Sequence, residues 1–223
     1  MCCLPGAALT GLAGIDALSP STGPGAGRGV HVVHDDAPLD QAVDGIVETL
    51  GTDRRVLVAE SVADELGELL GARIAGLRVG DPLDRNTDVG PVSSRERRDR
   101  AAALLAAALR AAGGDARGCV PSASTLPERG LYLAPTLLTD VAPTSPPARD
   151  EITGPLVPVL TFRTPAEAVA LAGAVRTAAV WTDKGSRALW TAQRLRAAVV
   201  WVNAVDRWDP ALPGAALANH LAL

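Results

Sequence analysis

Short apolar runs alternate with longer segments of helical periodicity from Val30 onward. Arg55–Ala59 (RVLVA) is a continuous apolar run that suits a buried strand. After it, hydrophobic residues recur every three or four positions and would share one face of a helix: Val62, Leu66, Leu69, Leu70, Ile74 and Leu77. The whole pattern predicts strands over 30–33, 55–59, 156–162, 178–182 and 199–202, and helices over 38–50, 62–77, 94–112, 165–172 and 186–197. Such alternation predicts an α/β domain with a largely parallel sheet flanked by helices.

Helix boundaries carry their own signals. Thr164-Pro165-Ala166-Glu167 has the form of a capping box with proline at the first helical position. Asp36 precedes the helix predicted from Pro38, so we expect it to be that helix's N-cap. Gly113-Gly114 suits a left-handed stop after the helix over 94–112.

Glycine and proline also mark the domain organisation. Ser19–Gly29 (SPSTGPGAGRG) has no periodicity and is typical of a linker. We therefore expect a flexible N-terminal segment over 1–29, one folded domain over 30–210 and a C-terminal tail over 211–223. A chain of 223 residues, 48% hydrophobic, is long enough for one well-buried domain.

Charge and composition exclude several classes of partner. The formal net charge is −4, so a surface that tracks nucleic-acid phosphates is not expected. The first residues have no basic region and Pro5 breaks their apolar run, so the sequence predicts neither a signal peptide nor a membrane span. Three cysteines, two of them adjacent, do not make a disulfide framework, which agrees with a cytoplasmic location.

Several segments, in order, resemble the aldehyde dehydrogenase superfamily. Leu77–Pro91 (LRVGDPLDRNTDVGP) is similar to its "vGdPld..td.GP" segment, and His34–Val43 (HDDAPLDQAV) to the start of its D-D-A helix. Tyr132–Asp140 (YLAPTLLTD) and Asp150–Pro155 (DEITGP) resemble two further motifs, as do the strands around Trp181 and Trp201. The resemblance covers roughly 30–210 and implies that family's catalytic-domain fold, without its cofactor-binding domain.

The resemblance also implies a chemistry that this chain does not supply in full. The family uses a cysteine thiolate, a carboxylate base and a nicotinamide cofactor. Its cysteine loop lies between the D-D-A helix and the next strand, where this chain has only Glu48–Asp53 (ETLGTD) and no cysteine. The text nearest to its base motif is Gly11–Ile15 (GLAGI), with glycine at the carboxylate position. No catalytic residue is therefore assigned.

One cofactor contact is implied to survive. Glu151 matches the glutamate that holds the nicotinamide ribose in the family, although Thr153 replaces the phenylalanine two positions on. A glutamate in this place could also do no more than hold a loop. NAD(P) is the cofactor by resemblance, and none is expected on the isolated chain. The family's segment before its terminal strand is absent, and Pro213-Gly214-Ala215 is at most a remnant of it.

Other reactive residues are better explained by structure. Cys119 is far along the chain from the family's nucleophile position, and Cys2 and Cys3 lack partner residues. His31 and His34 are three apart on a strand and would point to opposite faces, so no metal site is expected. Trp181 and Trp201 lie in apolar runs that suit the core, whereas Trp190 and Trp208 suit a partner surface.

The sequence thus favours an aldehyde dehydrogenase-family protein without independent catalytic activity, acting as a partner-binding or regulatory subunit. Its partner would be a complete aldehyde dehydrogenase subunit in a hetero-oligomer. Two alternatives stay open: one part of a split NAD(P)-dependent enzyme that is active only with a complementary chain, and a gene fragment without function.

Overall fold

One eight-stranded sheet organises the part of the chain that the computed structural model describes, namely residues 28–111, 119–121, 125–207 and 220–222. Its order is β3-β4-β5-β2-β1-β6-β7-β8, and all neighbours are parallel except the β3–β4 pair. The strands are β1 Gly29–Val33, β2 Arg54–Ala59, β3 Cys119–Pro121, β4 Thr136–Leu138, β5 Leu156–Phe162, β6 Ala174–Trp181, β7 Arg196–Val202 and β8 His220–Ala222. The expected largely parallel sheet is confirmed.

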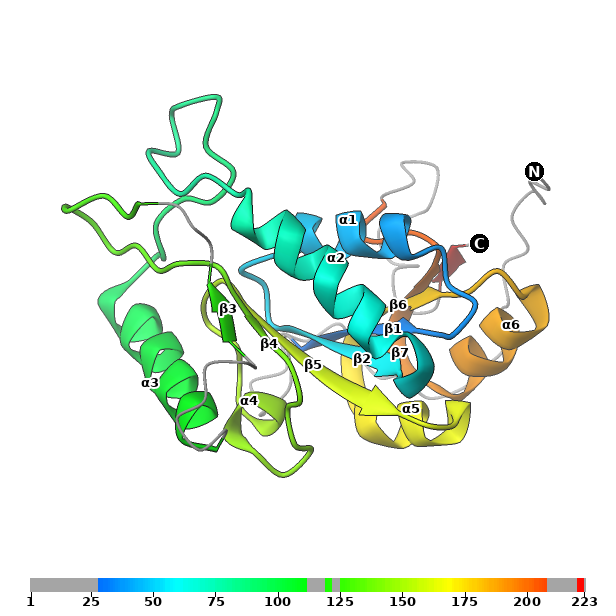
Figure 1. Ribbon diagram of the computed structural model, residues 1–223. Coiled ribbons are helices and arrows are strands. Elements are labelled where there is room, and N and C mark those ends of the chain that lie inside the picture. Colours follow the sequence, from blue (N-terminus) through cyan, green and yellow to red (C-terminus); the bar gives the residue numbers. More distant parts are fainter. Residues whose placement is uncertain (1–27, 112–118, 122–124, 208–219, 223) are drawn as a thin grey trace.

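Helices cover both faces of this sheet (Figure 1). Helices α1 (Leu39–Glu48) and α2 (Ala63–Ala75) lie on one face, with the short 3-10 turn η1 (Glu60–Val62) before α2. Helices α5 (Pro165–Ala172) and α6 (Gly185–Arg194) lie on the other. Helices α3 (Arg95–Ala111) and α4 (Pro146–Arg149) flank the β3–β4 end. The arrangement is the three-layer α/β architecture that the sequence predicts.

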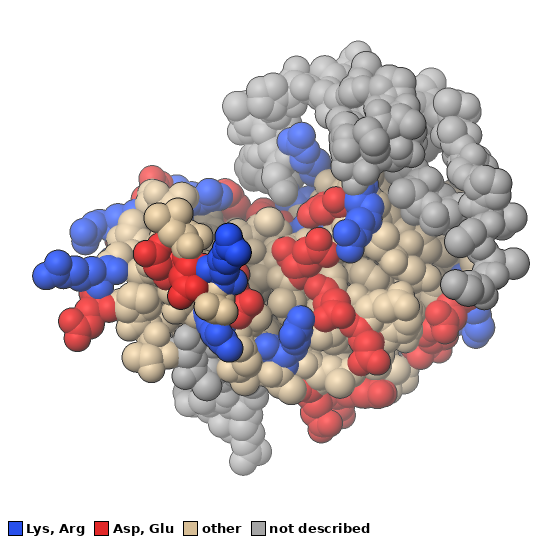
Figure 2. Space-filling view, turned by 90° about the horizontal axis from the view of Figure 1, so that it is seen from above, with Lys and Arg blue, Asp and Glu red and all other residues tan. Residues whose placement is uncertain are grey.

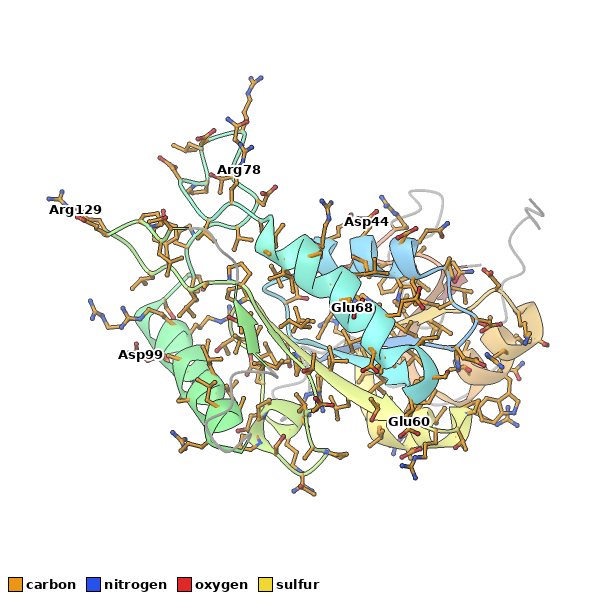
Figure 3. The ribbon with its side chains drawn as sticks, in the orientation of Figure 1. Asp44, Glu60, Glu68, Arg78, Asp99 and Arg129 are labelled. Carbon is orange, nitrogen blue, oxygen red and sulfur yellow. The ribbon has the colours of Figure 1, made fainter. Side chains whose placement is uncertain are left out.

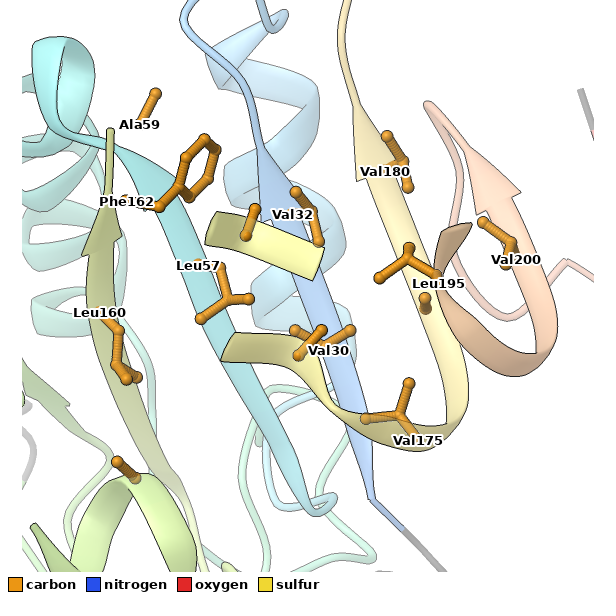
Figure 4. Close-up of a cluster of buried hydrophobic side chains, with 14 of the residues drawn as sticks. Val30, Val32, Leu57, Ala59, Leu160, Phe162, Val175, Val180, Leu195 and Val200 are labelled. Carbon is orange, nitrogen blue, oxygen red and sulfur yellow. The ribbon is translucent and has the colours of Figure 1, made fainter. Parts of the chain in front are cut away.

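Two hydrophobic clusters hold the layers together, one on each face of the sheet. Val30 and Val32 of β1 pack with α5 and α6, whereas Val33 packs with α1 and α2. All five residues of β1 are buried, because a central parallel strand is covered on both sides. Figure 4 shows the α5/α6-side cluster, with Ala59 and Phe162 at the end where their strands finish.

Most predicted elements are confirmed with small shifts at their ends. Strand β5 and helix α5 have the predicted bounds, and β1, α1, β2, α2 and α3 agree to within a few residues. The capping interaction at α5 is present, since the Glu167 N–H donates to Thr164 Oγ1 at 3.2 Å. The Glu167 carboxylate accepts from the N–H of Arg163 at 2.8 Å, one residue before the N-cap. Trp181 and Trp201 are buried, as expected.

The region from 173 to 199 differs from the prediction. Gly173 ends α5 with φ 63°, and β6 then begins at Ala174 instead of 178. Helix α6 stops at Arg194 because Leu195 turns extended and packs into the core. Ala197, expected in the helix, pairs with Val175 of β6. Pairing with a central strand has outweighed the helical propensity of a short alanine run.

Other elements have no counterpart in the prediction. Strands β3, β4 and β8 and helix α4 have three or four residues each, too few to show a period. Strand β8 lies within the expected C-terminal tail and pairs with β7. The expectations for Cys2, Cys3, Gly11–Ile15, Ser19–Gly27, Gly113-Gly114, Trp208 and Pro213–Ala215 lie outside the described residues. In the described part, no helix is both long enough and apolar enough to cross a membrane.

Candidate functional site

The segment that carries Glu151 lies between α4 and β5, at the amino end of the parallel strands. Ile152 and Thr153 are buried there, whereas the Glu151 side chain is 54% exposed. The Ile152 N–H donates to Asp53 Oδ1 at 2.9 Å, and the Thr153 hydroxyl donates to the Arg97 carbonyl at 2.9 Å. Because hydrogen bonds hold the two residues that follow it, the backbone at Glu151 is fixed while its side chain faces solvent. Its ion-pair partner among the described residues is Arg97, with 3.8 Å between Oε1 and Nη2.

Asp53 joins this segment to the start of β1 and β2. Burial raises the pKa of Asp53, while the Ile152 N–H bond and Arg28, 3.8 Å away, act in the opposite direction. Arg55 donates to the carbonyl of Ala148, and burial lowers its pKa to about 10, so it remains charged at neutral pH. Asp53 was not singled out from the sequence. Its partners are far away along the chain, and no local pattern could have revealed them.

The connection from α1 to β2 is a closed turn of only five residues, Thr49–Asp53. Thr49 Oγ1 donates back to the carbonyls of Gly45 and Ile46, and the Thr52 N–H donates to the Thr49 carbonyl at 3.2 Å. Gly51 has φ 86°, a conformation that L side chains rarely adopt. The turn contains no thiol, and its backbone is bonded to itself.

A groove of about 640 Å³ opens beside this turn. It lies between the ends of α1 and α2, the loop before α3, and the start of β5, and four charged side chains line it: Glu48, Arg73, Asp88 and Arg97. Two acids and two arginines give the lining no net charge. Part of its wall is formed by Thr153, Gly154 and Pro155. Glu151 lies next to the groove, because its ion-pair partner Arg97 is one of the lining residues. The groove is large enough for a small molecule or an inserted loop.

Charges elsewhere on this side of the molecule are mixed. Figure 2, seen from above, shows acidic and basic side chains interspersed over the visible face. Arg73 of α2 pairs with Asp44 of α1 at 3.5 Å, and Arg207 with Glu48 at 3.6 Å. A face of this kind lacks the continuous basic stripe that nucleic-acid binding needs.

His31 of β1 and His34, the residue after β1, lie on opposite faces of the sheet, as expected, and both are buried. His31 accepts from Trp181 Nε1 at its Nδ1 (3.2 Å), so its Nε2 carries the proton directed at Thr49 Oγ1 (3.0 Å). His34 Nε2 is 3.1 Å from Thr191 Oγ1. Burial lowers the pKa of His31 to about 3 and of His34 to about 4, so both are neutral. In the described residues, no three His, Cys, Asp or Glu side chains gather as metal ligands would.

Asp36 is not the N-cap of α1, and the expectation is wrong. Pro38 occupies the N-cap position without a side-chain bond. Asp36 instead accepts from the Thr182 hydroxyl and from Arg187 Nη1, both at 2.7 Å. Burial alone would raise the pKa of Asp36, but the bonds from Thr182 and Arg187 act against burial, and the pKa is lowered overall. Arg187 of α6 and Thr182, which follows β6, thus bind the carboxylate that was expected to cap α1.

Cys119 lies on the outer strand β3, with β4 and β5 between it and β2. At the usual spacing between strands, its backbone is roughly 14 Å from β2 across the sheet. The structure therefore does not bring it to the α1–β2 turn.

Trp190 is partly exposed, and the Arg194 guanidinium stacks 4.3 Å from its ring centroid. Its predicted role in partner contact stays a prediction.

Comparison with known proteins gives one consistent family. The model of the aldehyde dehydrogenase family matches residues 16–214. A betaine aldehyde dehydrogenase from Rhizobium leguminosarum bv. trifolii is 33% identical over 197 residues, which are 81% of this chain and 39% of that protein.

Solved structures agree. The NAD-dependent aldehyde dehydrogenase of Sinorhizobium meliloti superposes with a TM-score of 0.75 at 34% identity, covering 84% of this chain and 39% of the other. Lactaldehyde dehydrogenase of Escherichia coli gives 0.71 at 25% identity, covering 82% and 40%. The chain thus spans about two fifths of the length of these relatives. With the fold, the ordered motifs and these matches in agreement, the chain belongs to the aldehyde dehydrogenase family.

Proposed function

We propose that this protein is a non-catalytic member of its family that acts as a partner-binding or regulatory subunit of a complete aldehyde dehydrogenase. One observation carries the proposal: the five-residue turn Thr49–Asp53 stands where the family resemblance implies a cysteine loop. An acyl-transfer route through a thioester needs a thiolate at the carbonyl carbon. No thiol lies in the turn, and Cys119 is on a distant strand.

The nicotinamide cofactor that the family implies has partial support from the residues present. The Glu151 carboxylate is exposed beside the groove and could accept hydrogen bonds from a ribose, which makes this corner compatible with the cofactor. A bound nicotinamide would supply the hydride acceptor. Within the described residues, Glu151 would orient the ribose, and Arg97 would hold the carboxylate in place when it is free.

A second candidate function is one part of a split NAD(P)-dependent enzyme. The open groove favours it, because a loop from a complementary chain could enter between α1, α2 and Thr153 and approach Glu151. In that assembly the complementary chain would contribute the nucleophile and the dinucleotide-binding part. We also propose a cytoplasmic location, since three cysteines do not form a disulfide framework.

Binding and turnover measurements test these proposals. NAD and NADP binding is measured by calorimetry, and NADH production is followed with short and long aldehydes, for the chain alone and mixed with a complete aldehyde dehydrogenase. Co-purification with that enzyme and no turnover alone are expected. Turnover by the isolated chain would refute the non-catalytic role. Turnover only with a complementary chain that lacks activity itself would establish the split enzyme instead.

A matched pair of variants locates any cofactor binding. Glu151→Gln removes the carboxylate beside the groove, whereas Glu128→Gln changes an exposed glutamate in the segment before Tyr132. If a mixed assembly binds NAD through this corner, only the first substitution weakens binding. Equal effects of both would show that Glu151 has no such role.

A further inference from the structure

The carboxyl ends of the central strands form a second groove, at the opposite edge of the sheet from Glu151. Its volume is about 360 Å³, and its lining comes from the ends of β1, β2 and β5, from η1, and from α5 and α6. Strand β1 leads by α1 over one face of the sheet, whereas its neighbour β6 leads by α6 over the other. Ligands of open α/β sheets bind outside the carboxyl ends of the strands near such a reversal, and Asp35 after β1 and Arg187 of α6 connect the groove to it.

Charged side chains line this groove in two pairs. Arg187 donates through Nη1 to Asp35 and to Asp36. On the other side, Arg163 Nε donates to Glu60 Oε2 at 2.9 Å. Among the described residues these bonds leave Arg187 Nε and Nη2 and Arg163 Nη1 as donors for a ligand.

The carboxylates of the same pairs are accessible from solvent. The side chains of Asp35 and Glu60 are 51% and 57% exposed. Asp36 accepts from the Arg187 guanidinium and Glu167 from the backbone N–H of Arg163, so both add negative charge near the two arginines. A ligand with only an anionic group would therefore be repelled, whereas one with an ammonium group as well would meet both kinds of partner.

The remaining lining is uncharged. Ala59, Phe162 and Pro165 supply apolar surface, and the buried His34 packs edge-on against Phe162 with 5.6 Å between ring centroids. The volume is within the range of small-molecule sites and exceeds what one amino acid fills. We propose that this groove binds a zwitterionic small molecule of the α-amino acid class, with its carboxylate on Arg163 and Arg187, its ammonium on Asp35 and Glu60, and an apolar side group over Pro165.

Three probes of one shape test the requirement for both charges. Leucine has both, leucinamide lacks the carboxylate, and 4-methylvalerate lacks the ammonium. Binding to the full chain is measured by calorimetry and by ligand-observed NMR at pH 7.5. Leucine is expected to bind at least tenfold more tightly than either analogue. Equal binding of one analogue, or a leucine Kd above 10 mM, would overturn the proposal.

Variants locate the site. Arg163→Gln and Glu60→Gln each remove one partner from side chains that are 77% and 57% exposed, so the fold is kept. Each is expected to weaken leucine binding tenfold or more. Arg129→Gln is the control, because Figure 3 shows Arg129 at the far end of the molecule from Glu60. An unchanged Kd in Arg163→Gln, or an equal loss in Arg129→Gln, would exclude this groove. The test is independent of NAD binding and of any partner subunit.

Discussion

Acid should destabilise this protein well above the pKa of its carboxylates, because two neutral histidines are buried, one on each face of the sheet. His31 is held between Trp181 and Thr49, and His34 is bonded to Thr191. Their pKa values are lowered by burial to about 3 and about 4. The unfolded chain therefore takes up protons at these sites as pH falls through about 6.5, while the folded chain does not.

The size of the effect follows from those values. Between pH 7.5 and 5.5, each histidine removes about 1.35 kcal/mol from the free energy of unfolding, and the two together remove about 2.7 kcal/mol. Stability should be nearly constant above pH 7, fall through this window and continue to fall until the folded-state pKa values are reached. For a domain whose total stability is about 5–15 kcal/mol, this loss is large.

Urea unfolding at several pH values, followed by tryptophan fluorescence, measures the loss. His34→Gln can keep a hydrogen bond to Thr191 but cannot be protonated, so it should reduce the loss to about 1.35 kcal/mol. His31→Gln should do the same, and the double variant should show almost none in this window. Equal free energies of unfolding at pH 7.5 and 5.5 for the unmodified chain would refute the reasoning, as would an unchanged loss in the double variant.

Two further predictions concern helix packing and capping. Gly45→Ala should lower the free energy of unfolding by about 1–3 kcal/mol, because the new Cβ would lie 2.5 Å from the Trp181 ring. In the control Gly67→Ala, the new Cβ would have only one atom within 4 Å, at 3.9 Å, so helix propensity should raise the free energy of unfolding by about 0.5–1 kcal/mol. Urea titration measures both changes. A change of the same sign in the two variants would contradict the packing argument. Thr164→Ala should cost about 1 kcal/mol by removing the acceptor for the Glu167 N–H, whereas Thr164→Ser should restore most of it in the same assay.

Much of the fold could be predicted because its central elements have long, regular patterns. Strands β2 and β5 are continuous apolar runs, and α1 and α2 repeat every three or four residues. At Ala197 the sequence pattern predicts helix, but strand pairing with Val175 of β6 determines the observed structure. Strand β4 could not be predicted, since three residues show no period and its place depends on pairing with β5.

The candidate site was less accessible to sequence reasoning. Glu151 was found because the text around it resembles a family motif. Asp53, which fixes the backbone beside Glu151, contacts residues 25 and 99 positions away, and nothing local marks it. Asp36 was misassigned for the same reason, since a cap is a local rule and Arg187 lies 151 positions further along.

The position of β1 at the centre of the sheet has a consequence for synthesis on the ribosome. One side of β1 can pair with β2 soon after both strands emerge, but its other side pairs with β6, whose partner residues run from Thr177 to Trp181. For most of translation the nascent chain therefore exposes an apolar strand with a bare hydrogen-bonding edge. Yield of this protein in a cell should depend on how quickly its last third is made, and on a chaperone that shields that edge meanwhile.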